Sequence, residues 1–199
     1  PIKIDISASE LIEKNVLAQP YIKFIKVPSI KTKGTYQSIY KEFVVENDVR
    51  NNIIRKEVLS LIGKGYKPLV LFKQIKHGNI LAELFKDSNI KFDILSGKDS
   101  LEKRNIIKEK YNNNEIDVIL ASTIFDIGVD IPKLNSLVLA GAGKSYVRAL
   151  QRIGRVIRPY PGKKSAAIVD FYDDVKYLKT HSETRYAIYN SEKGFKVYR

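Results

Sequence analysis

The chain has 199 residues, of which 44% are hydrophobic and 29% are charged, as is typical of a globular protein that buries its own core. It contains no cysteine and only two, widely separated histidines, which excludes disulfides and zinc–thiolate sites; we expect no metal site built by this chain alone and a cytoplasmic, reducing location. A net charge of +13, from 35 basic and 22 acidic residues, favours a polyanionic partner such as nucleic acid, and the lack of a long apolar run argues against a membrane partner.

Residues 1–45 have a mixed pattern that we interpret as a linker and edge structure from a preceding domain. A short helix is expected over residues 10–17 and a strand over residues 21–27, followed by a loop over residues 28–37. The chain begins at Pro1 without a methionine or a signal-peptide pattern, so we expect it to be a fragment of a longer protein.

Residues 46–172 alternate helical patterns with short apolar runs, beginning with a helix capped by Asn47 or Asp48 and ended near Gly63. Strands are expected at residues 68–72, 92–95, 117–121, 136–140 and 166–170, with helices over residues 79–86 and 100–111 between them, the second capped by Ser100 or Asp99. Continuous apolar strands separated by helices predict an α/β fold in which a parallel sheet carries helices on both faces. Residues 173–199 are polar and aromatic; we expect Asp173 and Asp174 to open a helix there, and we expect this tail to pack on the sheet domain.

A short arginine-rich helix is expected over residues 149–158, before Pro159. At the helical period three polar residues share one narrow face, with a glycine at its edge and another arginine beside it: Gln151, Arg155 and Arg158, then Gly154 and Arg152. Crowded guanidinium groups repel one another, so this face suits an anion with several oxygens, and a polyphosphate meets that requirement. The alternative is a basic surface helix that is solvated or contacts a nucleic-acid backbone.

Ligands of parallel sheets bind beyond the carboxyl ends of the strands, which makes the residues there candidates by position alone. They are Lys73, Gln74, Ser96, Gly97, Ser122, Thr123 and residues 141–145. In the last group, Gly143, Lys144 and Ser145 look like the end of a phosphate loop, but Val138 stands where such a loop needs its opening glycine. We therefore interpret this segment as a strand-to-helix connection with Ser145 as the N-cap.

The segment from Asp126 to Pro132 follows the third of these strands. Gly128 permits a tight turn or the close approach of a ligand, and Asp130 offers a carboxylate to a ribose hydroxyl or a cation. Taken alone, the segment is more typical of a simple turn, and its spacing before the arginine-rich helix favours the site interpretation.

Three segments together resemble the second RecA-like domain of superfamily 2 helicases. Residues 68–74 resemble motif IV, residues 119–132 resemble motif V, and residues 151–158 match motif VI in its Q-R-x-G-R-x-x-R form. The resemblance covers residues 66–172, and finer features, including residues 75–78, are most similar to the UvsW-type DNA helicases. It implies the RecA-like form of the α/β fold.

The resemblance also implies a role for each matching position. Arg155 and Arg158 would be arginine fingers that reach the γ-phosphate of ATP, which with Mg²⁺ is bound mainly by a first RecA-like domain of the same polypeptide. Further nucleotide contacts are implied for Gly128, Asp130, Gln151 and Arg152, and contacts to nucleic-acid phosphates for Gly97, Arg104 and Thr123. The alternative for Thr123 is a strand-end hydroxyl that bonds to the backbone, and for Arg104 a solvated helix residue. His77 is expected to do no chemistry.

The chain lacks a complete phosphate loop, an Asp-Glu pair of the Walker B type and an adenine-binding segment, all of which belong to a first RecA-like domain in the helicases it resembles. We therefore interpret it as the C-terminal motor domain of an ATP-dependent DNA helicase or translocase that hydrolyses no ATP on its own. The sequence does not separate DNA from RNA as the partner. It leaves two alternatives open: a non-catalytic nucleic-acid-binding domain and, resting only on the loop at Gly143, a self-contained phosphate-loop enzyme.

Overall fold

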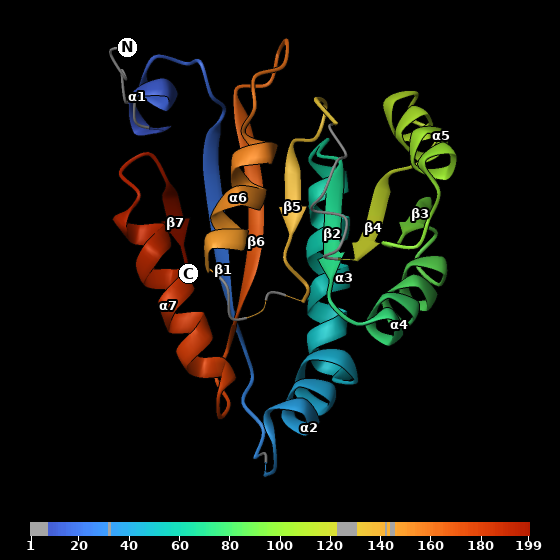
Figure 1. Cartoon of the computed structure of the whole chain (residues 1–199), viewed down its shortest axis with the longest axis vertical. Helices are drawn as coiled ribbons and strands as arrows, with labels where there is room; N and C mark the ends of the chain where they lie inside the picture. Colours follow the sequence, from blue (N-terminus) through green and yellow to red (C-terminus); the bar gives the residue numbers. More distant parts are fainter. Residues whose placement is uncertain (1–7, 32, 123–130, 142, 144–145) are drawn as a thin grey trace.

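The computed structural model describes residues 8–31, 33–122, 131–141, 143 and 146–199. Within these residues the chain forms one parallel sheet with the strand order β3-β4-β2-β5-β6-β1-β7 (Figure 1). The strands are β1 (Gln19–Val27), β2 (Pro68–Phe72), β3 (Phe92–Leu95), β4 (Val118–Ser122), β5 (Ser136–Val138), β6 (Ser165–Asp173) and β7 (Lys196–Tyr198). The helices are α1 (Ala8–Glu13), α2 (Tyr36–Tyr40), the π-helix η1 (Lys41–Val45), α3 (Asp48–Gly63), α4 (Ile75–Lys86), α5 (Leu101–Asn112), α6 (Tyr146–Val156) and α7 (Leu178–Ser191).

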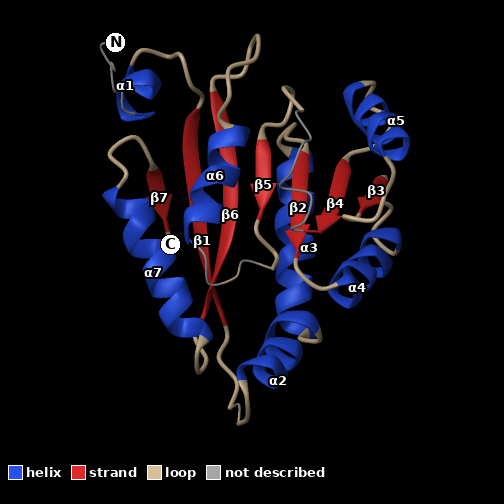
Figure 2. Ribbon diagram, in the orientation of Figure 1, coloured by secondary structure: helices blue, strands red, loops and turns tan. Residues whose placement is uncertain are grey.

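Helices cover both faces of the sheet, as the sequence predicts (Figure 2). On one face α5, α6 and α7 pack through buried residues such as Ile107, Ile153 and Tyr189. On the other face α3 and α4 pack, together with α2 and η1, through residues such as Ile54 and Phe85. The predicted fold class, a parallel α/β sheet between two layers of helices, is confirmed.

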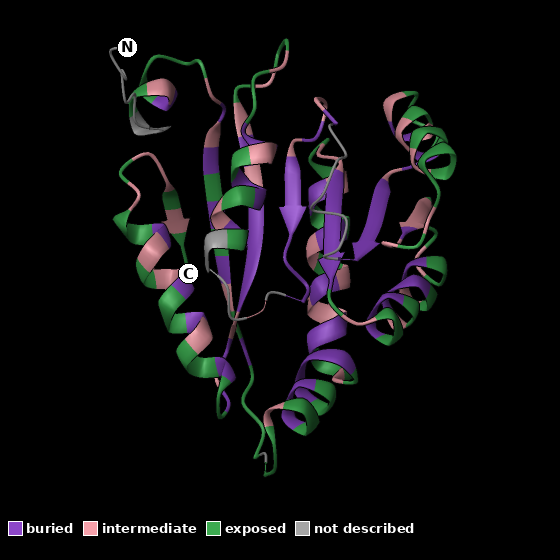
Figure 3. Ribbon diagram, in the orientation of Figure 1, coloured by how far each residue is buried: buried purple, intermediate pink, exposed green. Residues whose placement is uncertain are grey.

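The central strands are buried along their whole length (Figure 3). Every residue of β2 and of β4 is buried, because helices cover the side chains that point to either face. This is why these strands are continuous apolar runs in the sequence and do not alternate between apolar and polar residues.

Two helix starts follow directly from the sequence. The side chain of Asn47 accepts a hydrogen bond from the backbone N–H of Arg50, and the side chain of Ser100 accepts one from Lys103, so the predicted N-caps of α3 and α5 are confirmed. Asp99, the other predicted cap of α5, bonds instead to the backbone N–H of Ser96.

The expectation of edge structure in the first part of the chain is wrong for β1. This strand pairs with β6 from Gln19 to Val27, and β7 pairs with its other side, so β1 lies inside the sheet. The predicted loop over residues 28–37 overlaps the start of α2, and η1 follows α2 directly; Ile39 and Phe43 of these two helices are fully buried. Short elements of three to five residues carry too little periodicity to be identified in a sequence.

The C-terminal helix begins later than the acidic pair at residues 173 and 174 suggests. Asp173 is the last residue of β6, and its carboxylate accepts a hydrogen bond from Arg50 Nε at 2.9 Å. Since this carboxylate serves a buried ion pair, it caps no helix, and α7 starts at Leu178.

Candidate functional site

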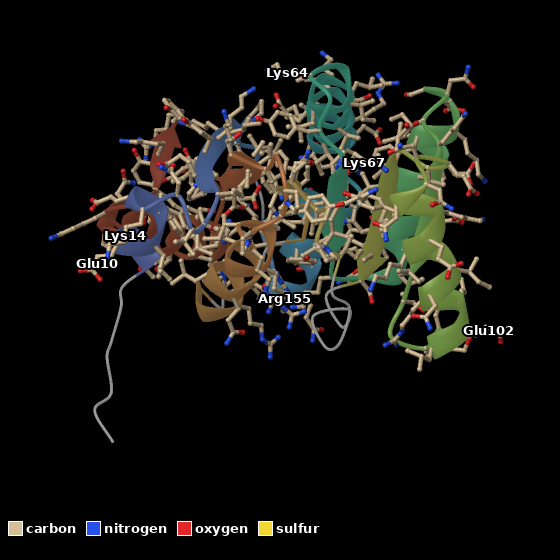
Figure 4. The ribbon with its side chains drawn as sticks, turned by 90° about the horizontal axis from the view of Figure 1, so that it is seen from above. Glu10, Lys14, Lys64, Lys67, Glu102 and Arg155 are labelled. Atoms are coloured by element: carbon tan, nitrogen blue, oxygen red, sulfur yellow. The ribbon has the colours of Figure 1, made fainter. Side chains whose placement is uncertain are left out.

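The arginine-rich segment lies on α6, which is fixed to the sheet by one face and exposed on the other. Ala149, Ile153 and Val156 are at most 2% exposed and belong to the core of this face of the sheet. Gln151 is exposed and Arg155 is partly exposed. Figure 4 looks along the strands from their amino-terminal ends and shows Arg155 on the face of the sheet that α6 covers.

The exposed face of α6 is longer than motif VI. Arg148 is exposed and lies seven residues before Arg155, which places it on the same side of the helix. At the other end, Ile157 N donates to Ile153 O at 3.0 Å, so the helical hydrogen bonding reaches Ile157 and the exposed Arg158 follows at once. The exposed face therefore carries basic groups from its first turn to just beyond its last.

Gly154 lies on this exposed face, and nothing in the described chain requires a glycine there. A methyl group added to its Cα would meet no described heavy atom within 4 Å. The space over Gly154 is therefore open to a partner or ligand, and a backbone without a side chain permits the close approach of a phosphate.

Arg152 points to the inside of the molecule. It is only 7% exposed, and its charge acts on Tyr189 of α7. Burial and then the charge of Asp170 raise the pKa of Tyr189 well above its ordinary value, and the Tyr189 hydroxyl donates to Asp170 Oδ2 at 2.8 Å. Arg152 thus belongs to the contact between α6 and α7, so it is placed to orient α6 and not to touch a ligand on the exposed face.

A buried ion pair ties α7 to the segment that precedes α6. Arg185 Nε donates to Asp170 Oδ2 at 2.8 Å, and both side chains are at most 1% exposed. Although burial opposes the charge of Arg185, the Asp170 carboxylate raises the pKa of this guanidinium above its ordinary value. Arg185 Nη1 also donates to Gly143 O at 3.3 Å, so one guanidinium connects β6, α7 and the approach to α6.

Gly141 permits the connection after β5 to touch the end of β2. A Cβ at this position would lie 2.6 Å from the backbone nitrogen of Lys73, which is closer than atoms can approach. Val138 is the last residue of β5 and pairs with Val70 and Val169, so its backbone belongs to the sheet and does not open a phosphate loop. These contacts support the interpretation as a strand-to-helix connection.

Two predicted nucleic-acid residues, Gly97 and Arg104, lie together beyond the carboxyl end of β3. Arg104 Nη2 donates to Gly97 O at 3.2 Å, while Arg104 Nε is buried and has no hydrogen-bond partner among the described residues. Asp99 holds the same turn, because its carboxylate accepts from the backbone N–H of Ser96 at 2.5 Å and from Lys103 Nζ at 2.8 Å. Arg104 is therefore partly buried and holds this turn, unlike a solvated helix residue.

An aromatic cluster that the sequence did not indicate lies at the carboxyl end of β2. Lys73 Nζ is 5.2 Å from the ring centroid of Tyr40 and 5.8 Å from that of Tyr36. The Tyr36 ring meets the Tyr177 ring edge-on at 6.3 Å, and Tyr177 is 41% exposed with a φ of 67°, a backbone conformation that bulky residues rarely adopt. These residues come from three distant segments, which is why no local pattern reveals them.

Three predicted site residues, Thr123, Gly128 and Asp130, lie outside the described residues, as do Lys144 and Ser145. Ser122, the last residue of β4, is described and buried, and its Oγ has no hydrogen-bond partner among the described residues.

His77 joins two helices on the other face of the sheet. Its Nε2 lies 2.9 Å from Asn51 Oδ1 of α3, and burial, followed by the charge of Arg50, lowers the pKa of His77 to about 3. A buried imidazole that stays neutral at physiological pH is a packing residue, as the sequence suggests.

The described part of the chain offers neither a metal cluster nor a membrane span. Among the described residues, no three His, Asp or Glu side chains gather closely enough to hold a metal ion. None of the helices in the described ranges is both long and apolar enough to cross a bilayer.

Comparison with known proteins places this chain in one protein family. The model of the helicase conserved C-terminal domain matches residues 50–160, which is more than half of the chain. The ATP-dependent DNA helicase UvsW of Enterobacteria phage T4 is 31% identical over 194 residues, a match that covers 93% of this chain and 38% of UvsW. The crystal structure of T4 UvsW superposes with a TM-score of 0.73 at 29% identity and covers 91% of this chain and 40% of that structure.

Two further relatives are also helicases by name. Putative helicase 22 of Sulfolobus islandicus filamentous virus is 32% identical over 162 residues, covering 80% of this chain and 28% of the relative. The pre-mRNA-splicing ATP-dependent RNA helicase Prp28 of Saccharomyces cerevisiae is 25% identical over 201 residues, covering 90% of this chain and 34% of Prp28. The chain therefore spans 28% to 38% of the length of these relatives.

Proposed function

Because the chain belongs to the helicase conserved C-terminal domain family, we propose that it is the C-terminal motor domain of an ATP-dependent DNA helicase or translocase. The observation that carries this proposal is the exposed face of α6, where basic residues flank a glycine with open space above it. A surface of this kind accepts an anion brought by another domain, and its residues match the motif VI pattern in the sequence.

In this proposal Arg155 and Arg158 are arginine fingers. The bound group would be ATP with Mg²⁺, held mainly by a first RecA-like domain, and it supplies the phosphoryl group whose transfer releases energy. Arg155 and Arg158 stabilise the negative charge that develops on that group, an effect worth about 10³ to 10⁵ in turnover. Gln151, exposed on the same helix, supports this contact from the neighbouring turn.

Arg152 and Arg185 act as positioning residues. Both are buried, and through Tyr189 and Asp170 they fix α6 against α7. An arginine finger stabilises the transferred phosphoryl group only when its guanidinium is held close to that group in the right orientation. Residues that fix α6 rigidly against α7 therefore contribute to turnover without touching the nucleotide. Asp130 and Gly128 complete the proposed nucleotide contacts, with Asp130 near the ribose.

The nucleic-acid strand is proposed to cross the carboxyl end of the sheet. Gly97, Arg104 and Thr123 contact its phosphates there, with the Arg104 guanidinium held beside Gly97 in the same turn. The cluster of Tyr36, Lys73 and Tyr177 at the end of β2 offers a ring face and a cation to an unpaired base.

DNA is the proposed partner because of the similarity to UvsW, which is named a DNA helicase, whereas Prp28 is named an RNA helicase. The proposed location is the cytoplasm, a reducing compartment that suits a chain without cysteine.

The proposal is tested by ATP hydrolysis in the presence of DNA, measured for the isolated chain and for the whole product of its gene. We expect turnover only in the whole product, because the isolated chain offers fingers without a phosphate loop. Robust hydrolysis by the isolated chain would favour a self-contained enzyme, and a gene that encodes no phosphate loop and no Asp-Glu pair would favour the non-catalytic nucleic-acid-binding domain.

A further inference from the structure

A basic cavity lies at the amino-terminal end of the sheet, at the opposite end from the proposed strand contacts, and its lining residue Tyr160 follows Arg158 by two residues. It has a volume of about 500 Å³ and lies among the segments that lead into β2, β5 and β6. Five of its lining residues are lysines: Lys64, Lys67, Lys133, Lys163 and Lys164. We call this cavity the amino-edge pocket.

The amino-edge pocket is separated from the carboxyl end by the length of a strand. Lys67 directly precedes β2 and Lys73 directly follows it, and five extended residues span about 17 Å. Figure 4 looks down on the amino-terminal end, where Lys64 lies on the far side of the molecule from Arg155. A ligand in this pocket therefore lies away from the proposed strand path at the carboxyl end.

Three of the lysines are anchored by uncharged groups. Lys67 Nζ donates to Tyr111 O and, at 3.0 Å, to Asn114 Oδ1, and Lys133 Nζ donates to Asn112 O at 3.0 Å. These acceptors lie at the carboxyl-terminal end of α5, where cations are favourable. Lys163 Nζ donates in the same way to the backbone oxygens of Pro132 and Leu134, each at 3.0 Å.

The anchors of Lys67 and Lys133 hold their ammonium groups in place without pairing them with a carboxylate. Within the described part of the chain, Lys64, Lys67, Lys133 and Lys164 form no ion pair with a carboxylate. Burial and then the charge of Lys133 lower the pKa of Lys67, and Asp117 offsets this only in part. Like charges gathered around one cavity oppose folding unless an anion binds among them.

Lys64 and Lys164 have no comparable part in the fold. Both are exposed, and their ammonium groups make no hydrogen bond or ion pair with any described residue. Capping of α5 explains Lys67 and Lys133, but it does not explain why two further lysines lie at the same cavity. Their flexible ammonium groups suit phosphates as point charges.

Two tyrosines and two glycines complete the pocket. Gly65 and Gly162 have φ values of 80° and 79°, which only glycine adopts readily, and a Cβ on either would meet no described heavy atom within 4 Å. Tyr66 and Tyr160 add hydroxyl groups and ring surface to the lining. The cavity is larger than a single phosphate requires, and its cations come from separate loops, so it suits phosphates in series.

We propose that the amino-edge pocket is a second nucleic-acid contact, which binds consecutive phosphates of a DNA backbone outside the strand path at the carboxyl end. The proposal goes beyond the motor function, because it needs neither the arginine fingers nor ATP. It adds an anchor for a part of the DNA that the carboxyl end of the sheet does not reach.

The test uses Lys64→Glu/Lys164→Glu in the isolated chain, because neither side chain supports the fold. Binding of fluorescein-labelled duplex and single-stranded DNA is measured by anisotropy over a series of KCl concentrations. We expect a loss of affinity of about tenfold or more at low salt. On duplex DNA the salt slope should fall by about 0.9 for each phosphate that the altered pocket no longer neutralises. Lys64→Gln/Lys164→Gln should give a smaller loss of affinity in the same direction.

The matched control is Lys14→Glu/Lys193→Glu, which removes the same charge from exposed lysines elsewhere. Equal losses of affinity in the two charge-reversed proteins would overturn the proposal, because only the net charge would then matter. Unchanged DNA binding in Lys64→Glu/Lys164→Glu would overturn it as well. A loss of tripolyphosphate binding, measured by calorimetry, with DNA binding intact would also overturn it and assign the pocket to free polyphosphates. Arg104→Ala separates the pocket from the strand path: if it alone weakens DNA binding, the strand path stands and the pocket proposal fails.

Discussion

Gly154 lies inside α6 at a position where the fold does not require a glycine. A glycine inside a helix costs about 0.5–1 kcal/mol relative to alanine, and no described neighbour of Gly154 would obstruct a methyl group. The fold itself therefore gains nothing from this glycine, which points to a close approach from outside the chain. Gly63, near the end of α3, is equally open and lies on a helix that carries no proposed ligand contact.

The difference between Gly154 and Gly63 leads to the first prediction. Gly154→Ala should raise the free energy of unfolding of the isolated chain by about 0.5–1 kcal/mol in urea titrations. In the whole gene product it should lower ATP turnover by about tenfold to a hundredfold, since a small displacement of the reacting groups is enough. Gly63→Ala should leave turnover unchanged, and full turnover in Gly154→Ala would show that nothing approaches this face closely.

His77 gives the second prediction, which concerns pH. The pKa of His77 is about 3 in the fold and near its ordinary value of 6.5 in the unfolded chain, so between these values the unfolded state binds the extra proton. The stability that comes from neutral His77 is therefore complete above pH 6.5 and is lost progressively as the pH falls toward 3. From pH 7 to pH 5 the loss is about 2 kcal/mol.

The measurement compares urea unfolding of the original chain with that of His77→Gln at pH 7 and pH 5. Carboxylates titrate alike in both proteins, so their effect cancels in the comparison. We expect the original chain to lose about 2 kcal/mol more than His77→Gln over this interval. Equal losses would mean that His77 is already protonated or solvated in the fold.

Strand β1 determines where the folding unit begins. The family match starts at residue 50 and the sequence pattern suggested a domain from residue 46, yet β1 lies between β6 and β7. Its residues Ile22, Phe24 and Val27 are at most 1% exposed. A chain that lacks this strand would expose the flank of β6 along its length.

The third prediction follows from this position. Removal of residues 1–45 should abolish cooperative urea unfolding and leave a protein that aggregates, because an interior strand and the helices α2 and η1 are removed together. Circular dichroism during a urea titration, with sedimentation to detect aggregates, checks this. A sharp unfolding transition in the truncated chain would show that the first elements are accessory.

The sequence predicts long and strongly patterned elements because their signals are local. β2 and β4 are apolar runs buried on both faces, and Asn47 and Ser100 cap helices through bonds to residues three positions away. β1 and α7 are less predictable, since their places depend on distant partners. The start of α7 is displaced because Asp173 pairs with Arg50, at a separation of 123 residues.

Among the described residues of the molecule, positive charge gathers on the exposed face of α6 and around the amino-edge pocket. The motif pattern identified the exposed face of α6, because Gln151, Arg155 and Arg158 are close in sequence. The sequence pattern does not reveal the amino-edge pocket, because its lysines are spread from Lys64 to Lys164 and only the folded sheet brings them together. For the same reason, the link from Arg152 through Tyr189 to Asp170 could not be read from spacing alone.

These two places suggest a division of labour in a longer polypeptide. The α6 face would serve ATP turnover with a partner domain, and the ends of the sheet would hold nucleic acid. DNA binding should then survive the removal of the arginine fingers, and turnover should be far more sensitive to α6 than to the amino-edge pocket.

The most direct test of the motor assignment is steady-state ATP turnover by the whole gene product with DNA present, compared for Arg155→Ala, Arg158→Ala and the control Arg55→Ala on α3. We predict that each finger variant loses about 10³-fold or more in turnover while nucleotide binding changes little, and that Arg55→Ala keeps its turnover. Normal turnover in both finger variants would contradict the account.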